Sequence, residues 1–132
     1  MLGRPLITAT LALTALLWGS TAHAAAMAGA YTIGGAGADF DSIRHAVDSL
    51  AARGVGAAVT LNLRNGTYTE QVAIPPVAGT SASNTITFQS ESGDRDDVTW
   101  RFGSISSATA HVILLDGADH VRIRNLTLSS AV

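Results

Sequence analysis

The chain has 132 residues, with 8 Lys plus Arg against 10 Asp plus Glu, and 47% of its residues are hydrophobic. This length fits one small domain, and the near-neutral charge argues against the broad basic surface that is typical of nucleic-acid-binding proteins. The chain contains no cysteine, which excludes disulfide bonds, a thiolate nucleophile and cysteine metal ligands.

The first residues have the pattern of a secretory signal peptide. Arg4 supplies a positive start, the apolar run Leu6–Trp18 follows, and Ala22–Ala24 has the small-x-small pattern of a cleavage site. The apolar run is shorter than the roughly twenty residues that a membrane-spanning helix needs. We therefore predict a cleaved signal peptide over residues 1–24 and a secreted or cell-surface mature domain over 25–132, with no membrane attachment after cleavage.

The segment 41–53 has the pattern of an amphipathic α-helix. Its apolar residues recur at the three- and four-residue spacing of one helix face: Ile43, Ala46, Val47, Leu50 and Ala51. Asp39 or Asp41 is placed to accept hydrogen bonds from the free amides at the helix N-terminus, and Gly54 fits a C-terminal cap. We predict one helix over 41–53.

A glycine-rich loop precedes this helix and raises the question of a dinucleotide site. Gly35 and Gly37 match the first two glycines of the G-x-G-x-x-G fingerprint, but Phe40 stands at the third position. Asp39 and Asp41 would also place negative charge where a pyrophosphate has to sit. Only a short strand, AYTI, precedes the loop. We therefore interpret the loop as a tight turn into the helix and predict no nucleotide site.

Beyond this helix the sequence consists of short runs that alternate apolar and polar residues, separated by Gly, Asn, Asp and Ser. Two series of inward-facing pairs emerge, one from Leu61/Leu63 through Ile86/Phe88 to Ile113/Leu115, the other from Val72/Ile74 through Val98/Trp100 to Val121/Ile123. Both series step by about 25 residues, a pattern typical of a solenoid. The alternative, a β-sandwich, would show stronger hairpin signals. The spacing predicts an all-β solenoid, a parallel β-helix of about three coils over 57–132, with the 41–53 helix capping its first coil.

Several motifs resemble a known superfamily. The segments GAGADFDSIRHAVDSL, VTLNLRNGTYTEQVAI and TITFQSESGD are similar to the N-terminal portion of right-handed parallel β-helix proteins of the pectin lyase-like superfamily. The pattern D-F-x-S-I, helix, strand, N-G-T-Y-x-E-x-V is similar to the opening of pectinesterases, and NTITFQSESGD with HVILLDGADHVRIRNLTL resembles modules of large exported bacterial surface proteins. The resemblance implies a right-handed parallel β-helix but no activity, because we find no counterpart of the pectinesterase catalytic motifs before Val132.

Other polar clusters give weak signals for chemistry. The acidic segment Glu91–Asp97 lacks the ligand spacing of an EF-hand and is typical of a solvated turn. Asp116 and Asp119 frame an Asp-Gly turn, and His111 and His120 have no third ligand for zinc. We predict no catalytic residue, no metal site and no cofactor.

The basic residues are all arginine, and three of them are predicted to bind substrate. Arg101, Arg122 and Arg124 fall at outward positions of one strand series, so we expect their guanidinium groups to stack on one sheet face. Arginine binds carboxylates in a bidentate fork, and uronic-acid polymers present carboxylates at regular spacing. The arrangement predicts contact with an acidic polysaccharide. The alternative is that these arginines pair with Asp96, Asp97 or Asp119.

Two functions remain open from the sequence. In the first, the chain is a non-catalytic fragment, or a surface or carbohydrate-contacting portion, of a larger exported protein. In the second, it is the N-terminal portion of a pectinesterase-like or pectate lyase-like enzyme whose active site lies on downstream coils. The missing catalytic motifs favour the first. The final segment LTLSSAV shows no terminal cap, so we expect the chain to be the front of a longer protein.

Overall fold

The computed structural model describes residues 24–103, 106 and 108–131, so the predicted signal peptide lies outside the described residues except for its last position. The elements in chain order are β1 (Met27–Ile33), α2 (Ile43–Arg53), β2 (Val55–Leu63), β3 (Gly66–Thr69), β4 (Val72–Ile74), β5 (Ile86–Ser90), the 3-10 turn η1 (Arg95–Asp97), β6 (Val98–Gly103), β7 (Ile113–Leu115), β8 (Val121–Arg124) and β9 (Thr127–Ala131). The helix therefore lies within the predicted range.

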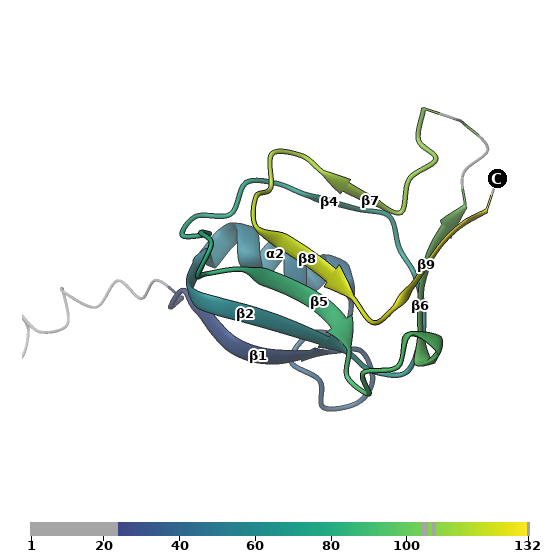
Figure 1. The fold of residues 1–132 in the computed structure, drawn as a ribbon, viewed down its shortest axis with the longest axis horizontal. Helices are drawn as coiled ribbons and strands as arrows, with labels where there is room; N and C mark the ends of the chain where they lie inside the picture. The colour runs from purple at the N-terminus through teal and green to yellow at the C-terminus, as the bar shows by residue number, and fades with distance from the viewer. Residues whose placement is uncertain (1–23, 104–105, 107, 132) are drawn as a thin grey trace, which may run out of the picture.

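The strands form three parallel sheets. The largest has the order β1-β2-β5-β8, the second β3-β6-β9, and the third contains β4 and β7 alone. Figure 1 shows the four strands of the largest sheet side by side, with α2 behind them, β6 and β9 at the right and β4 and β7 above. The helix packs against β1 and β4.

This arrangement is a small α/β domain, and the predicted all-β solenoid, a right-handed parallel β-helix of about three coils over 57–132, is wrong. The sheets contain four, three and two strands. Only two successive stretches of chain, β2 to β4 and β5 to β7, give a strand to every sheet, and the next stretch supplies only β8 and β9. The largest sheet also begins with β1, which precedes the helix and was not among the predicted coils. The described residues therefore form no closed three-coil solenoid.

The predicted strand series correctly joined β2 to β5, two residues out of the observed register, but each of their other steps joined strands of different sheets. Phe88 aligns with Ile123 rather than with Leu115. Ile74 aligns with Leu115 rather than with Trp100. Alternation identifies which side chains face inward, but it carries no information about which of several similar strands lies alongside. With three sheets in place of two, strands at comparable sequence separations were assigned to the wrong sheet.

The core lies between the sheets and the helix. The helix buries four side chains, Ile43, Ala46, Val47 and Leu50. Phe88 and Trp100 are the largest fully buried side chains, and their ring centroids lie 5.9 Å apart. The indole nitrogen of Trp100 donates to the backbone carbonyl of Glu70 at 2.9 Å, which satisfies its one polar atom inside the core.

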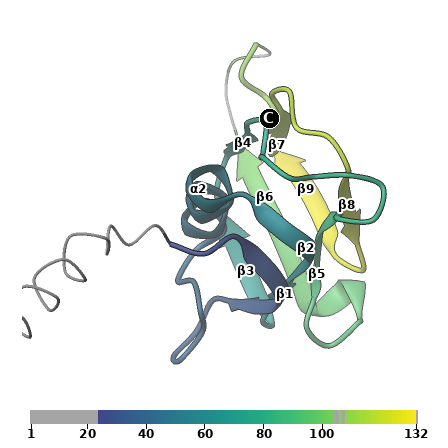
Figure 2. The same ribbon diagram turned by 90° about the vertical axis from the view of Figure 1, so that its left-hand side faces the viewer.

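The two ends of the core differ. At the β1 end the helix covers the core, whereas β7, β8 and β9 are the last strands of their sheets and lie together on the other side, at the right in Figure 2. Leu114, Leu115 and Leu128 are 44%, 50% and 48% exposed there. Leu115 and Leu128 also line a shallow apolar hollow together with Ile113 and Ile123. Within the described part of the chain, the β8 edge has no strand partner.

Candidate ligand-binding surface

The outer face of the largest sheet carries two aligned rows of side chains. The register places Ala30, Thr60, Thr87 and Arg122 in the first, which we call the Arg122 row. It places Thr32, Asn62, Gln89 and Arg124 in the second, the Arg124 row. Neighbouring parallel strands lie about 4.8 Å apart, so each row spans about 14 Å across the sheet. Apart from Ala30, every residue of the two rows has a polar or charged side chain.

Two amide side chains meet in the middle of the Arg124 row. Gln89 Nε2 donates a hydrogen bond to Asn62 Oδ1 at 3.0 Å, and both side chains are half-buried. This bond uses one donor of Gln89 and the acceptor of Asn62. The Asn62 amide nitrogen and the Gln89 amide oxygen have no other side-chain partner among the described residues.

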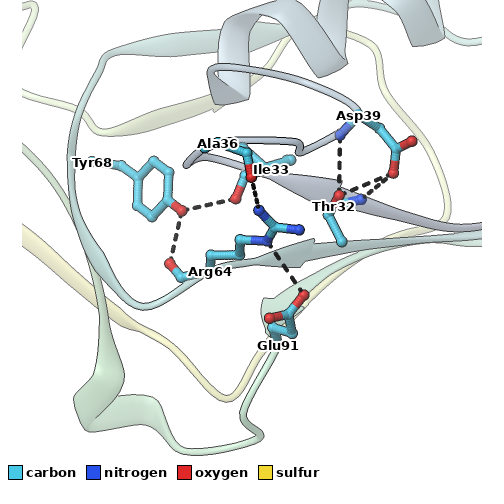
Figure 3. A network of polar contacts seen from close by, with 7 residues as sticks. All are labelled: Thr32, Ile33, Ala36, Asp39, Arg64, Tyr68 and Glu91. Atoms are coloured by element: carbon cyan, nitrogen blue, oxygen red, sulfur yellow. Dashed lines mark hydrogen bonds and ion pairs between the residues drawn. The ribbon is translucent and has the colours of Figure 1, made fainter.

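A carboxylate stands at the β1 end of the same row. Asp39 Oδ2 accepts from the Thr32 amide at 2.8 Å and from the Thr32 hydroxyl at 3.0 Å, and the Thr32 hydroxyl accepts from the Asp39 amide at 3.0 Å (Figure 3). The bond from the Thr32 amide, followed by the one from its hydroxyl, holds the pKa of Asp39 below its ordinary value. Asp39 is therefore ionised at neutral pH, and the nearby Arg64 guanidinium, whose charge also lowers the pKa of Asp39, offsets the negative charge at this end of the Arg124 row.

The two β8 arginines share one face. Arg122 and Arg124 are exposed at alternate positions of the edge strand, while Val121 and Ile123 between them are half-buried. None of the ion pairs in the described part of the chain involves either arginine. Pairing with an aspartate, the alternative that the sequence left open, therefore does not occur between described residues.

Arg101, the third predicted binding residue, lies on a different sheet. It belongs to β6, where it aligns with Thr69 of β3 and Ser129 of β9. The expected stacking of Arg101 with Arg122 and Arg124 on one sheet face is therefore wrong, because β6 and β8 belong to separate sheets. A role of the three arginines in binding substrate stays a prediction.

The glycine-rich loop is held by side chains from β3 and from the turn before it. Arg64 donates to the Ala36 carbonyl at 2.7 Å, and its Nε lies 3.7 Å from a Glu91 oxygen. The Tyr68 hydroxyl lies within hydrogen-bond distance of the carbonyls of Ile33 and Arg64, at 2.9 and 2.7 Å, and shares its one proton between them, while burial raises the pKa of this hydroxyl. Figure 3 shows Arg64 reaching Ala36 in the loop and Tyr68 reaching Ile33 just before it. The loop is thus tied to the protein's own side chains.

The helix N-terminus is occupied by a residue that sequence reasoning missed. The two carboxylate oxygens of Glu70 accept from the amides of Ile43 and Arg44, each at 3.0 Å. Ser42 caps the same turn, its hydroxyl accepting from the His45 amide at 3.1 Å. An internal carboxylate therefore fills the position at which an anionic ligand would bind a helix N-terminus.

The expected cap by Asp39 or Asp41 is wrong. Asp39 binds Thr32, as described above, and Asp41 Oδ1 lies 2.9 Å from His45 Nδ1, a contact that lowers the pKa of Asp41. Glu70 lies 27 residues after Ile43 in the chain, so no local capping pattern points to it.

The acidic segment Glu91–Asp97 forms a turn at the surface. Asp94 Oδ1 accepts from the Asp96 amide at 2.9 Å, and Asp96 pairs with Arg95 at 3.7 Å, as expected for a solvated turn. No group of three or more His, Asp or Glu side chains within residues 24–103, 106 and 108–131 is placed to hold a metal ion. No helix in this described part is long and apolar enough to cross a membrane.

Comparisons with models of protein families, with curated proteins and with solved structures find no match to this chain. The resemblance to the pectin lyase-like superfamily therefore stays a prediction. With no relative to supply a role, the candidate surface rests on its own geometry, which joins exposed arginines to a row of uncharged polar side chains.

Proposed function

We propose that the chain is a non-catalytic binding module of an exported protein, and that it contacts acidic polysaccharide through the outer face of the largest sheet. The observation that carries the proposal is the pair Arg122 and Arg124. Both are exposed on one face of an edge strand, and neither has an acidic partner in the described part of the chain. A carboxylate that binds them displaces no ion pair between described residues.

The chemistry of the pair fits a polymer better than a small acid. A hydrogen bond to a charged group that is shielded from solvent contributes about 1.5–3 kcal/mol to the free energy of binding. An exposed ion pair contributes about 1 kcal/mol or less. Each arginine of this open surface therefore holds one carboxylate weakly. A polymer that presents several carboxylates gains affinity because each contact raises the effective concentration of the next.

Export is supported by the sequence of the N-terminus. Arg4, the apolar run Leu6–Trp18 and the small residues Ala22–Ala24 have the order of a signal peptide. The mature module is then expected to begin at Ala25 and to meet its ligand outside the cell or at its surface.

The test is retention of the exported protein on immobilised polygalacturonate at low ionic strength. Replacing Arg122 and Arg124 with glutamine is expected to abolish retention, whereas Arg95→Gln, which removes an exposed arginine from η1, is expected to retain most of it. The Arg101→Gln variant tests whether the third predicted residue contributes from its separate sheet. Unchanged retention of the Arg122→Gln/Arg124→Gln variant would refute the proposal. Cleavage or de-esterification of pectin by the protein would instead support the other candidate, the opening portion of a pectinesterase-like or pectate lyase-like enzyme.

A further inference from the structure

Asn65 and Gly66 form the corner between β2 and β3, where the chain leaves the largest sheet for the second one. Both residues are exposed, and so is Thr67, which follows them. The Asn65 side chain has no hydrogen-bond partner among the described residues. A Cβ atom added to Gly66 would meet no other atom within 4 Å, so the space beside this residue is open. The described residues therefore leave the Asn65 amide uncovered.

An asparagine followed by glycine can react with its own backbone. The backbone nitrogen of Gly66 attacks Asn65 Cγ, so that a new C–N bond forms, the Cγ–Nδ2 bond breaks and ammonia leaves. Water then opens the resulting cyclic imide at either carbonyl and gives aspartate or isoaspartate, in which the main chain runs through the former side chain. No electrons are transferred, and water is the sole co-reactant. Glycine favours the ring closure because it has no Cβ to crowd the attacking nitrogen.

The chain offers this reaction one favourable asparagine. Asn65 is followed by glycine, whereas the other asparagines of the sequence are followed by leucine or threonine, at Asn62, Asn84 and Asn125. Exposure and sequence therefore coincide at the β2–β3 corner.

We propose that Asn65 is a site of spontaneous deamidation in the folded protein, with a cyclic imide as the intermediate and aspartate and isoaspartate as the products. The inference is independent of the proposed function, because it involves neither of the β8 arginines. It makes the β2–β3 corner the place at which the exported protein changes chemically with time.

The isoaspartate product changes the corner more than the aspartate product does. It adds one carbon atom to the main chain between Arg64 and Gly66. The two ends of this stretch are held, because the Tyr68 hydroxyl lies 2.7 Å from the Arg64 carbonyl and Gly66 aligns with Val98 of β6. The longer main chain strains at least one of these contacts, so we expect isoaspartate to lower the urea midpoint of the domain.

The experiment follows deamidation of the exported protein in mildly alkaline buffer, both folded and unfolded in guanidinium chloride. Peptide mapping by mass spectrometry locates each conversion of an amide to an acid, and a protein isoaspartyl methyltransferase labels the isoaspartate product. In the folded protein we expect Asn65 to react at least about tenfold faster than Asn84 or Asn125. Because the exposed corner needs no opening of the fold, its folded and unfolded rates should agree within about threefold.

Two variants test the assignment to Asn65. Asn65→Gln is expected to stop the reaction at the corner, because glutamine has to close a larger and less favourable ring. Asn125→Gln is the matched control, since Asn125 is also exposed at a corner, between β8 and β9, and its loss is expected to leave the reaction at Asn65 unchanged.

A third variant separates the added charge from the added main-chain atom. Freshly prepared Asn65→Asp carries the new carboxylate without lengthening the main chain, so its urea midpoint is expected to lie near that of the unaltered protein. The purified isoaspartate form is expected to unfold at a lower urea concentration than Asn65→Asp.

The inference is overturned if folding slows the reaction of Asn65 by about tenfold or more, a comparison that needs no variant. It is equally overturned if the product contains aspartate without isoaspartate, since the reaction would then not pass through the cyclic imide. An isoaspartate form as stable as Asn65→Asp would contradict the expected effect on the fold.

Discussion

Replacing Glu70 with alanine is expected to destabilise the fold by removing the carboxylate that holds the start of α2. Glu70 accepts from the Ile43 amide in a partly buried hydrogen bond and from the Arg44 amide in an exposed one. A charge-assisted bond contributes about 1.5 kcal/mol when partly buried, and an exposed one about 0.5 kcal/mol. The sum is a loss of about 2 kcal/mol in the free energy of unfolding. For a domain of this size, a loss of that order lowers Tm by about 10 °C.

The assay is urea unfolding of the mature domain, followed by tryptophan fluorescence. Trp100 is the sole tryptophan after residue 24, and it lies fully buried in the core. The matched control is Glu91→Ala, because Glu91 is a carboxylate whose ion pair with Arg64 spans 3.7 Å at the surface. We expect that control to lie within about 0.5 kcal/mol of the unaltered protein. A Glu70→Ala variant as stable as the Glu91→Ala variant would refute the reasoning.

Two further changes follow from features at opposite ends of the core. The lowered pKa of Asp39 means that its contribution to stability is present above its ordinary pKa of 3.8 and is lost as the pH falls through the lower folded value. As the pH is lowered below about 5, the free energy of unfolding of Asp39→Asn should therefore fall less steeply than that of the unaltered protein. An equally steep fall in both proteins would contradict this reading. Leu115 and Leu128 are about half exposed, so we expect them to support self-association in solution. Replacing both with serine should lower that association, measured by light scattering, while the urea midpoint changes little. Equal scattering before and after the change would show that these leucines do not drive association.

The sequence predicted which side chains turn inward better than it predicted which strands pair. Alternation identified Leu61, Phe88 and Trp100 as core residues, and all three are fully buried. Helical spacing located α2 because an amphipathic face repeats every three to four residues, whatever the helix packs against. Both signals are local, so they do not depend on the order of the strands.

What the sequence could not supply was long-range pairing. A parallel strand bonds to a partner more than twenty residues away, and several of the strands here share the same alternation, so the order of β5, β7 and β8 was misassigned. The same difficulty hid the Glu70 contact with the helix and the Asn62–Gln89 bond, each of which spans 27 residues. These contacts become visible only once the register is known.

The uncovered end of the core implies a gradient of local stability along the largest sheet. Among the described strands, β2 and β5 have neighbours on both sides, whereas β8 has one, so amide hydrogens on β8 and β9 should exchange with solvent sooner than those on β2. Arg122 and Arg124 lie on the edge strand β8. A ligand that holds both arginines would therefore slow amide hydrogen exchange at β8 more than at the other strands. The exchange rate at β8 would then report whether the surface is occupied.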